Sequence, residues 1–165
     1  GSMTAPKGRG ARFRLALPDG GKATLIDESY NANPASMRAA IALLGQAEPE
    51  GRARRIAVLG DMRELGPTSA ELHAGLAPDL VAAKVDRVFL AGPMMRALHD
   101  ALPAALKGGY AETAADLEPM VAGDIERGDV VMVKGSNASR MGGLVERLRE
   151  KLAAEADGDL RQEAL

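Results

Sequence analysis

Short apolar segments alternate with longer amphipathic segments along most of the chain. Residues 55–60, 87–91 and 129–133 are nearly continuous apolar runs, typical of strands buried on both faces of a parallel sheet. Between these runs, apolar residues recur every three or four positions, as on one face of an α-helix. Strands that alternate with helices in this way predict right-handed crossovers and an α/β fold.

The N-terminal part of the chain has a different pattern, in which polar and apolar residues alternate one by one. Phe13 and Leu15 fall on one face of a predicted strand at residues 11–17. The turn sequence Pro-Asp-Gly-Gly at 18–21 leads into a second strand at 23–27. The full prediction is a three-layer α/β sandwich around a mainly parallel sheet of about six strands, with an N-terminal antiparallel hairpin.

Four of the five predicted helices begin at a residue whose side-chain oxygen can accept from free backbone N–H groups. The predicted N-caps are Asn33, Thr68, Thr113 and Ser139. At Thr68 the sequence Thr-Ser-Ala-Glu also matches a capping box. Gly108-Gly109 is predicted to end the helix that Pro93 begins, and residues 110–112 to form a weak strand.

The amino-acid composition argues against nucleic-acid-binding, disulfide-bonded and membrane-spanning proteins. The 165 residues fit one domain, and a formal net charge of -2 provides no basic surface for nucleic acid. The absence of cysteine excludes disulfides and thiolate metal sites. No apolar run approaches the ~20 residues of a membrane span, and no signal-peptide pattern opens the chain, so we expect a cytoplasmic protein.

We predict that the two ends of the chain are not part of the folded domain. Gly1-Ser2-Met3 is typical of a cloning remnant, and residues 157–165 form a polar tail. Residues 4–156 remain for the domain, which we expect to be a single one.

Polar residues concentrate in loops that follow predicted strands, where an open parallel sheet binds its ligands. Residues 27–33 carry two carboxylates, a phenol and two amides, and residues 60–66 follow a buried strand. At 134–137 a lysine leaves an apolar strand just before a helix, an arrangement suited to a carboxylate or phosphate. Each loop also has a purely structural interpretation, as helix caps, turn formers and solvated charges.

Other motifs carry less chemistry. Lys134-Gly135-Ser136 resembles the end of a phosphate-binding loop, but Asp129 stands where that loop needs glycine. The two histidines, His73 and His99, share no carboxylate cluster, and His73 is expected to be structural. We therefore predict no metal site.

The loops together resemble the Mur ligase family. The matching stretches are residues 25–37, 57–66 and 133–136, and Gly8-Arg9-Gly10 is similar to the family's hinge into its third domain. The resemblance extends to about Leu152 and implies that this chain is that third, Rossmann-like domain.

Several properties of the whole enzyme are implied by the resemblance. The family's central domain, absent here, binds ATP and Mg²⁺ and phosphorylates the terminal carboxylate of UDP-N-acetylmuramoyl-tripeptide. The amine of D-alanyl-D-alanine then attacks the acyl phosphate to form an amide. The resemblance thus implies an ATP-dependent ligase of peptidoglycan synthesis whose third domain has no activity alone.

Individual residues also receive implied roles. Arg9 is similar to an arginine that reaches the ATP phosphates after domain closure, and Glu28 to an acidic residue near the ribose. The cleft toward the central domain would be lined by Asp27, Tyr30, Asn31 and Asn33. Charge and position make Asp61, Lys134 and Ser136 candidates for the dipeptide.

A second hypothesis is a stand-alone Rossmann-like module that binds or senses a small ligand. That module would bind its ligand without partner domains, whereas a ligase domain that lacks half of its cleft would bind the dipeptide weakly.

Overall fold

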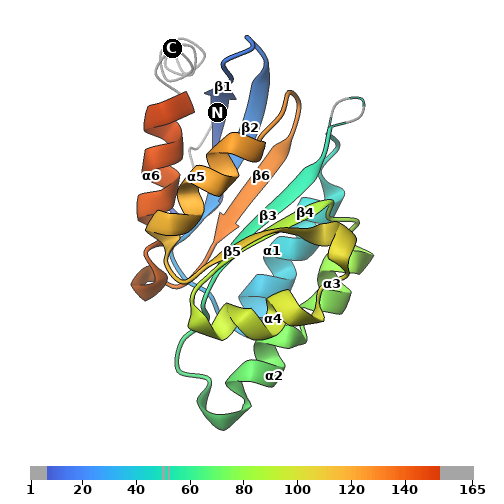
Figure 1. Cartoon of the computed structure of the whole chain (residues 1–165), viewed down its shortest axis with the longest axis vertical. Coiled ribbons are helices and arrows are strands. Elements are labelled where there is room, and N and C mark those ends of the chain that lie inside the picture. The colour runs from blue at the N-terminus through green and yellow to red at the C-terminus, as the bar shows by residue number, and fades with distance from the viewer. Residues whose placement is uncertain (1–6, 50, 52, 153–165) are drawn as a thin grey trace.

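The computed structural model describes residues 7–49, 51 and 53–152; the predicted cloning remnant and polar tail lie outside these residues. The described strands form a six-stranded sheet in the order β1-β2-β6-β3-β4-β5 (Figure 1). Its strands are β1 (Ala11–Ala16), β2 (Lys22–Glu28), β3 (Arg55–Gly60), β4 (Arg87–Ala91), β5 (Lys107–Ala111) and β6 (Val130–Lys134).

Only the edge strand β1 runs against its neighbour in this sheet. β1 pairs with β2 in antiparallel register, with Phe13 opposite Leu25, and the other paired strands are parallel. The predicted mainly parallel sheet with an N-terminal antiparallel hairpin is therefore confirmed. The position of β6 follows from no local pattern: the last strand in the chain is inserted between β2 and β3.

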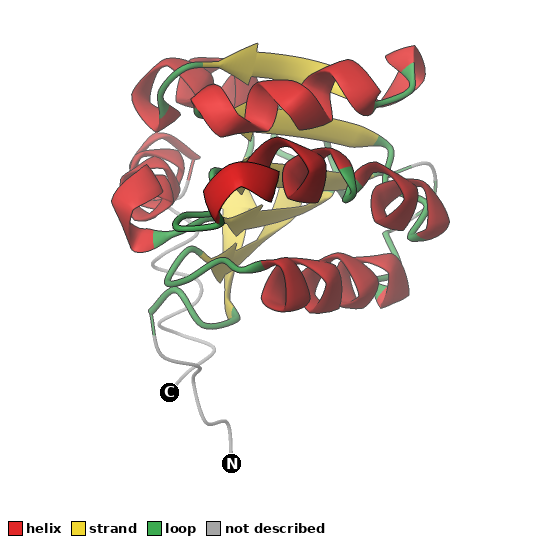
Figure 2. Ribbon diagram, turned by 90° about the horizontal axis from the view of Figure 1, so that it is seen from below, coloured by secondary structure: helices red, strands yellow, loops and turns green. Residues whose placement is uncertain are grey.

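Helices cover both faces of the sheet (Figure 2). The helices are α1 (Pro34–Gln46), α2 (Ser69–Ala74), α3 (Ala77–Ala82), α4 (Arg96–Ala101), α5 (Ala114–Asp124) and α6 (Met141–Leu152). Short 3₁₀ turns lie at Gly66–Thr68, Pro93–Met95, Ala104–Leu106 and Asn137–Ser139. None of the helices in the described part of the chain is long and apolar enough to span a membrane.

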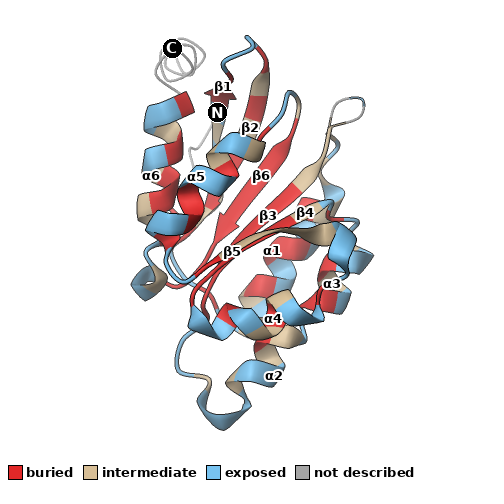
Figure 3. Cartoon of the chain, in the orientation of Figure 1, coloured by how far each residue is buried: buried red, intermediate tan, exposed pale blue. Residues whose placement is uncertain are grey.

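Two apolar cores lie on opposite faces of the sheet, which explains the continuous apolar runs in the sequence. Ile56 and Val58 of β3 point into the core under α5 and α6. Ala57 and Leu59 of the same strand point into the core under α1, α3 and α4. Figure 3 shows the central strands buried along most of their length. Because helices cover both faces of the sheet, the side chains on both sides of a central strand are apolar. The sequence of such a strand therefore shows no alternation of polar and apolar residues.

The predicted capping box at Thr68 is wrong. Thr68 ends the 3₁₀ turn Gly66–Thr68 with φ -91° and ψ 10°, and its side chain makes no capping hydrogen bond. An N-cap side chain reaches the free N–H groups from extended backbone, which a preceding 3₁₀ turn does not provide. The caps at Asn33 and Thr113 are confirmed, since each side chain accepts from the N–H three residues later.

Two further boundaries differ from the prediction. Gly108 and Gly109 lie inside β5, where a Cβ at Gly108 would come within 2.8 Å of the Phe89 ring on the neighbouring strand. The glycines thus make room for an aromatic core residue and do not end a helix. Ser139 does not cap α6: it closes a 3₁₀ turn that is itself capped by Ser136.

Candidate functional site

The loops that follow β2, β6 and β3 meet at the carboxyl edge of the sheet. Lys134, the last residue of β6, is paired with Glu28 on one side and with Leu59 on the other. The three strands are parallel, so the loops after them emerge next to one another. α1 after β2 and α6 after β6 pack on opposite faces, which makes this edge a switch point of the kind that binds ligands.

Lys134 lies at the centre of this edge and is almost completely buried. Its ammonium donates to the backbone carbonyl of Asn31 at 2.9 Å and lies 4.0 Å from a carboxylate oxygen of Glu28. Burial lowers the pKa of Lys134, and the nearby Glu28 carboxylate opposes that shift. The Asn31 side chain is exposed, and its oxygen accepts from the N–H of Ala32 at 2.8 Å.

Asp27 anchors the segment through which the chain enters the domain. One carboxylate oxygen accepts from the N–H of Gly8 at 3.0 Å, and the other accepts from the N–H and hydroxyl of Ser29 at 3.0 and 2.5 Å. The N–H of Tyr30 also donates to the carbonyl of Gly8 at 3.0 Å. These bonds fix Gly8, which has φ 77° and no room for a side chain against Tyr30.

The same contacts bring Arg9 and Tyr30 together at the rim. The Arg9 guanidinium lies 3.8 Å from the centre of the Tyr30 ring, a cation–π stack between two exposed residues. Asn33, two positions beyond Asn31, is exposed and forms a reciprocal capping box with Ser36. The exposed part of the rim is therefore formed by Arg9, Tyr30, Asn31 and Asn33, with Glu28 partly exposed beside them.

Asp61 links the loop after β3 to the loop after β4. Its two carboxylate oxygens accept from the N–H groups of Met95 at 2.9 Å and Met94 at 3.3 Å. Burial raises the pKa of Asp61, and these two N–H groups oppose that shift. Gly92 makes the contact possible, since a Cβ there would lie 2.4 Å from the carboxyl carbon of Asp61.

The loops after β3 and β6 are in direct contact. The N–H of Ser136 donates to the carbonyl of Asp61 at 3.4 Å, and the Ser136 hydroxyl accepts from the N–H of Ser139 at 3.1 Å. Gly60 and Gly135 allow this approach, because a Cβ at either position would lie within 2.8 Å of Ser139. The sequence contained both glycines but gave no indication that the same serine packs against them.

His73, on α2, binds the loop that follows β3. The side chain is completely buried; Nε2 accepts from the N–H of Met62 at 3.0 Å, and Nδ1 lies 2.7 Å from the carbonyl of Ser69. A carbonyl only accepts, so Nδ1 donates to Ser69 in this arrangement while Nε2 accepts. The expected structural role of His73 is confirmed.

The predicted site residues thus lie at one edge but differ in exposure. Arg9, Tyr30, Asn31 and Asn33 face solvent and Glu28 is partly exposed, whereas Asp27, Asp61, Lys134 and Ser136 are buried and bound to backbone groups. Among residues 7–49, 51 and 53–152, no group of three or more His, Cys, Asp or Glu could hold a metal ion. The Met94 and Met95 amides that bind Asp61 were missed, because backbone N–H groups leave no residue-type signal in the sequence.

A doubly wound α/β sheet with polar loops at its carboxyl edge is an architecture in which ligands commonly bind at that edge. A family model described as the glutamate ligase domain of Mur ligases matches residues 11–137. The chain therefore belongs to the Mur ligase family, as the resemblance of its loops predicted.

Individual relatives agree on one enzyme. The chain is 33% identical over 160 residues to the UDP-N-acetylmuramoyl-tripeptide–D-alanyl-D-alanine ligase of Mycobacterium bovis, covering 84% of this chain and 31% of that protein. The Escherichia coli ligase of the same name is 35% identical over 133 residues, covering 76% of this chain and 27% of that protein. The chain therefore spans less than a third of the length of either relative.

A solved structure shows the same architecture. Crystal structure II of MurF from Acinetobacter baumannii superposes with a TM-score of 0.74 and 29% identity. The superposition covers 90% of this chain and 32% of that one. The fold described above therefore corresponds to about a third of MurF.

Proposed function

We propose that this chain is the C-terminal domain of a cytoplasmic, ATP-dependent ligase that joins D-alanyl-D-alanine to UDP-N-acetylmuramoyl-tripeptide in peptidoglycan precursor synthesis. The observation that carries the proposal is the match to ligases of that name over 84% and 76% of the chain. Those ligases are about three times as long as the matched part, so the reaction is assigned to the whole protein.

The proposed reaction has two steps. The terminal carboxylate of the tripeptide attacks the γ-phosphate of ATP, giving an acyl phosphate and ADP. The amine of D-alanyl-D-alanine then attacks the acyl carbon, loses a proton and displaces phosphate, leaving an amide. Acyl phosphates hydrolyse, so a domain that brings the amine as it closes over the intermediate supplies proximity while excluding water.

Lys134, Ser136 and Asp61 are proposed to bind the dipeptide. The hydrogen bond to Asn31 uses one of the three donors of the Lys134 ammonium, and the others can bind the dipeptide carboxylate together with the Ser136 loop. Each Asp61 oxygen accepts one N–H and retains a further lone pair for the dipeptide ammonium. The buried position of all three favours strong, weakly screened contacts.

Arg9 and Glu28 are proposed to contact the nucleotide after domain closure. An exposed guanidinium stacked on Tyr30 suits a phosphate, and a partly exposed carboxylate suits ribose hydroxyls. Tyr30, Asn31 and Asn33 would line the cleft, with Asp27 holding their loop. Mg²⁺ would neutralise charge on the ATP phosphates; with no carboxylate or histidine cluster in the described ranges, its binding is assigned to the preceding domain.

The test is a reaction with the whole protein. Purified enzyme with ATP, UDP-N-acetylmuramoyl-tripeptide and D-alanyl-D-alanine should release ADP and phosphate and form a product whose mass equals the two substrates joined with loss of water. The 165-residue chain should form neither ADP nor product. Lack of product from folded whole protein, or turnover by this chain alone, would contradict the proposal.

Calorimetric titration separates this proposal from a stand-alone ligand-binding module. The ligase domain should bind D-alanyl-D-alanine and ATP weakly or undetectably by itself, because the other half of each site lies in the preceding domains. Binding of either ligand with a dissociation constant of about 1 μM, equivalent to about 8 kcal/mol, would favour the module.

A further inference from the structure

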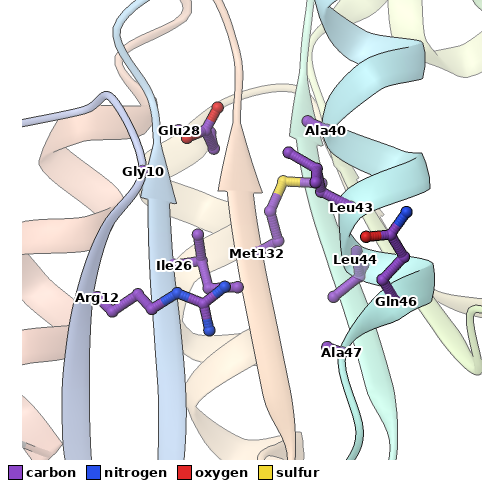
Figure 4. Close-up of a pocket in the computed structure, with 10 residues that line it drawn as sticks. All are labelled: Gly10, Arg12, Ile26, Glu28, Ala40, Leu43, Leu44, Gln46, Ala47 and Met132. Carbon is purple, nitrogen blue, oxygen red and sulfur yellow. The ribbon is translucent and has the colours of Figure 1, made fainter. Parts of the chain in front are cut away.

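A groove of about 440 Å³ lies beside α1, on the face of the sheet that α1, α3 and α4 cover. Figure 4 shows Ile26 of β2 and Met132 of β6 along its floor, and Leu43 and Gln46 on the α1 side. Arg12 extends from β1 across β2, with its guanidinium over the groove (Figure 4). The groove therefore lies over strands β2 and β6, with β1 on one side and helix α1 on the other.

The lining of this groove suits a protein surface. Its floor is apolar, since Ile26 and Met132 are buried, and Leu43 at its rim is 65% exposed. A leucine exposed to that degree gains by burial, and full burial of such a side chain contributes about 1.5–3 kcal/mol. Arg12 and Glu28 provide one charge of each sign around the apolar floor. This combination of apolar centre and charged rim is typical of an interface.

The position of the groove indicates which partner would fill it. Gly10 lines the groove and stands one residue before the start of the family match at residue 11. Its N–H donates to the carbonyl of Asp27 at 2.7 Å, which holds the entering chain against the groove. Under the proposed function the other domains precede residue 11, so the polypeptide that connects them emerges at the edge of this groove.

We propose that the groove between β1 and α1 is the docking surface for the preceding domain of the whole ligase. An apolar side chain of that domain inserts between Ile26 and Leu43, and an acidic side chain faces Arg12. This inference rests on the proposed function, because it takes the partner to be the rest of the same protein. Since Glu28 belongs to both the groove and the candidate site, docking here would connect domain closure with the nucleotide edge.

Hydroxyl-radical footprinting with mass spectrometry tests the docking surface without requiring turnover. Oxidation of Leu43 is measured in the 165-residue chain and in the whole protein, with and without ATP and D-alanyl-D-alanine. Val81 and Met120, which are 50% and 45% exposed and lie on α3 and α5, serve as internal controls. Leu43 should be oxidised about five-fold more slowly in the whole protein, because an interface core excludes water. The two controls should keep their rates.

The outcomes are separable from those of the ligase assay. An active ligase in which Leu43 is unprotected in every state overturns the docking surface and leaves the proposed function standing. Protection that depends on the concentration of the 165-residue chain alone would assign the groove to a second copy, which also overturns the proposal. Protection in a protein without ligase activity would support docking and contradict the proposed function.

A matched pair of substitutions provides the second measurement. Leu43→Glu places a charge in the groove, and Val81→Glu places one on an exposed helical surface away from it. In the whole protein, Leu43→Glu should lower kcat/KM about ten-fold or more, which corresponds to about 1.4 kcal/mol, while Val81→Glu leaves it unchanged. Both variants of the 165-residue chain should melt at the wild-type temperature. Equal activity of the two whole-protein variants would argue against docking at the groove.

Discussion

The ammonium of Lys134 lies 2.9 Å from the backbone carbonyl of Asn31, so the end of β6 holds the loop that follows β2. The two residues are 103 positions apart in the chain. Because Lys134 is buried while the Asn31 side chain is exposed, the contact connects the core to the rim of the candidate site. The rim can therefore keep its shape before a ligand arrives, which reduces the cost of binding.

Gly92 is predicted to be intolerant of any side chain. It has φ 111° and ψ 151°, a region that is essentially restricted to glycine, and a Cβ would lie 2.4 Å from the Asp61 carboxyl carbon. Gly92→Ala should destabilise the domain by about 3 kcal/mol or more, with both strain and clash contributing. Thermal unfolding should show a fall of about 2–4 °C for each kcal/mol.

Gly20→Ala is the matched control for that substitution. Gly20 also has positive φ, at 86°, but no atom lies within 4 Å of the Cβ position. Gly20→Ala should therefore lower the free energy of unfolding only by the backbone strain, about 1–2 kcal/mol. Equal melting temperatures for the two variants would show that Asp61 does not press against Gly92.

Helix capping gives a prediction in which structure and sequence pattern disagree. Thr113 accepts from the N–H of Asp116 at 3.1 Å, whereas Thr68 makes no capping hydrogen bond despite its capping-box sequence. Thr113→Ala should therefore lower the free energy of unfolding by about 1 kcal/mol, and Thr68→Ala by less than about 0.5 kcal/mol. Urea denaturation of the two variants measures this difference. A larger loss for Thr68→Ala than for Thr113→Ala would mean that Thr68 does cap its helix and Thr113 does not.

The same comparison shows what the sequence could predict about the fold. The apolar runs predicted β3, β4 and β6 to within one residue, because strands buried on both faces leave an unambiguous pattern. Boundaries failed where a 3₁₀ turn or a contact with a distant residue was involved. Thr68 ends a 3₁₀ turn, and Gly108 packs on the Phe89 ring of another strand, a contact that no local pattern records.

For the candidate site, the sequence predicted which loops meet but not how their side chains are used. The rule that parallel strands present their carboxyl ends together brought Asn31 and Lys134 to one edge. The insertion of β6 between β2 and β3 arises from long-range pairing and could not be inferred locally. For the same reason, the bonds from Asp61 to the Met94 and Met95 amides became visible only in three dimensions.

Asp61 should give the domain a characteristic dependence of stability on pH. Burial raises its pKa above the usual 3.8, so the folded state binds this proton more tightly than the unfolded state. The resulting stabilisation is complete below about pH 3.8 and is lost as the pH rises through the folded-state pKa. Asp61→Asn removes the titration.

Urea unfolding of both proteins between about pH 4 and pH 7 measures that effect. The free energy of unfolding of the wild type minus that of Asp61→Asn should decrease as the pH rises. A difference that stays constant, or that increases with pH, would mean that the Asp61 carboxyl is not held in a desolvated position.

The central claim is that buried polar groups at the carboxyl edge bind the dipeptide, and Lys134→Met in the whole enzyme tests it most directly. Methionine keeps a similar buried volume while removing the charge and the hydrogen bond to Asn31, so the melting temperature of the variant is measured first to verify that it is folded. Lys84→Met, at an exposed position after α3, is the control.

The decisive measurement is the KM for D-alanyl-D-alanine at saturating ATP and tripeptide. An ion-assisted contact contributes about 1.5–3 kcal/mol, so Lys134→Met should raise this KM about ten-fold or more, with a smaller change in the KM for ATP. Lys84→Met should leave both constants unchanged. A folded Lys134→Met enzyme with the wild-type KM for the dipeptide would contradict the account.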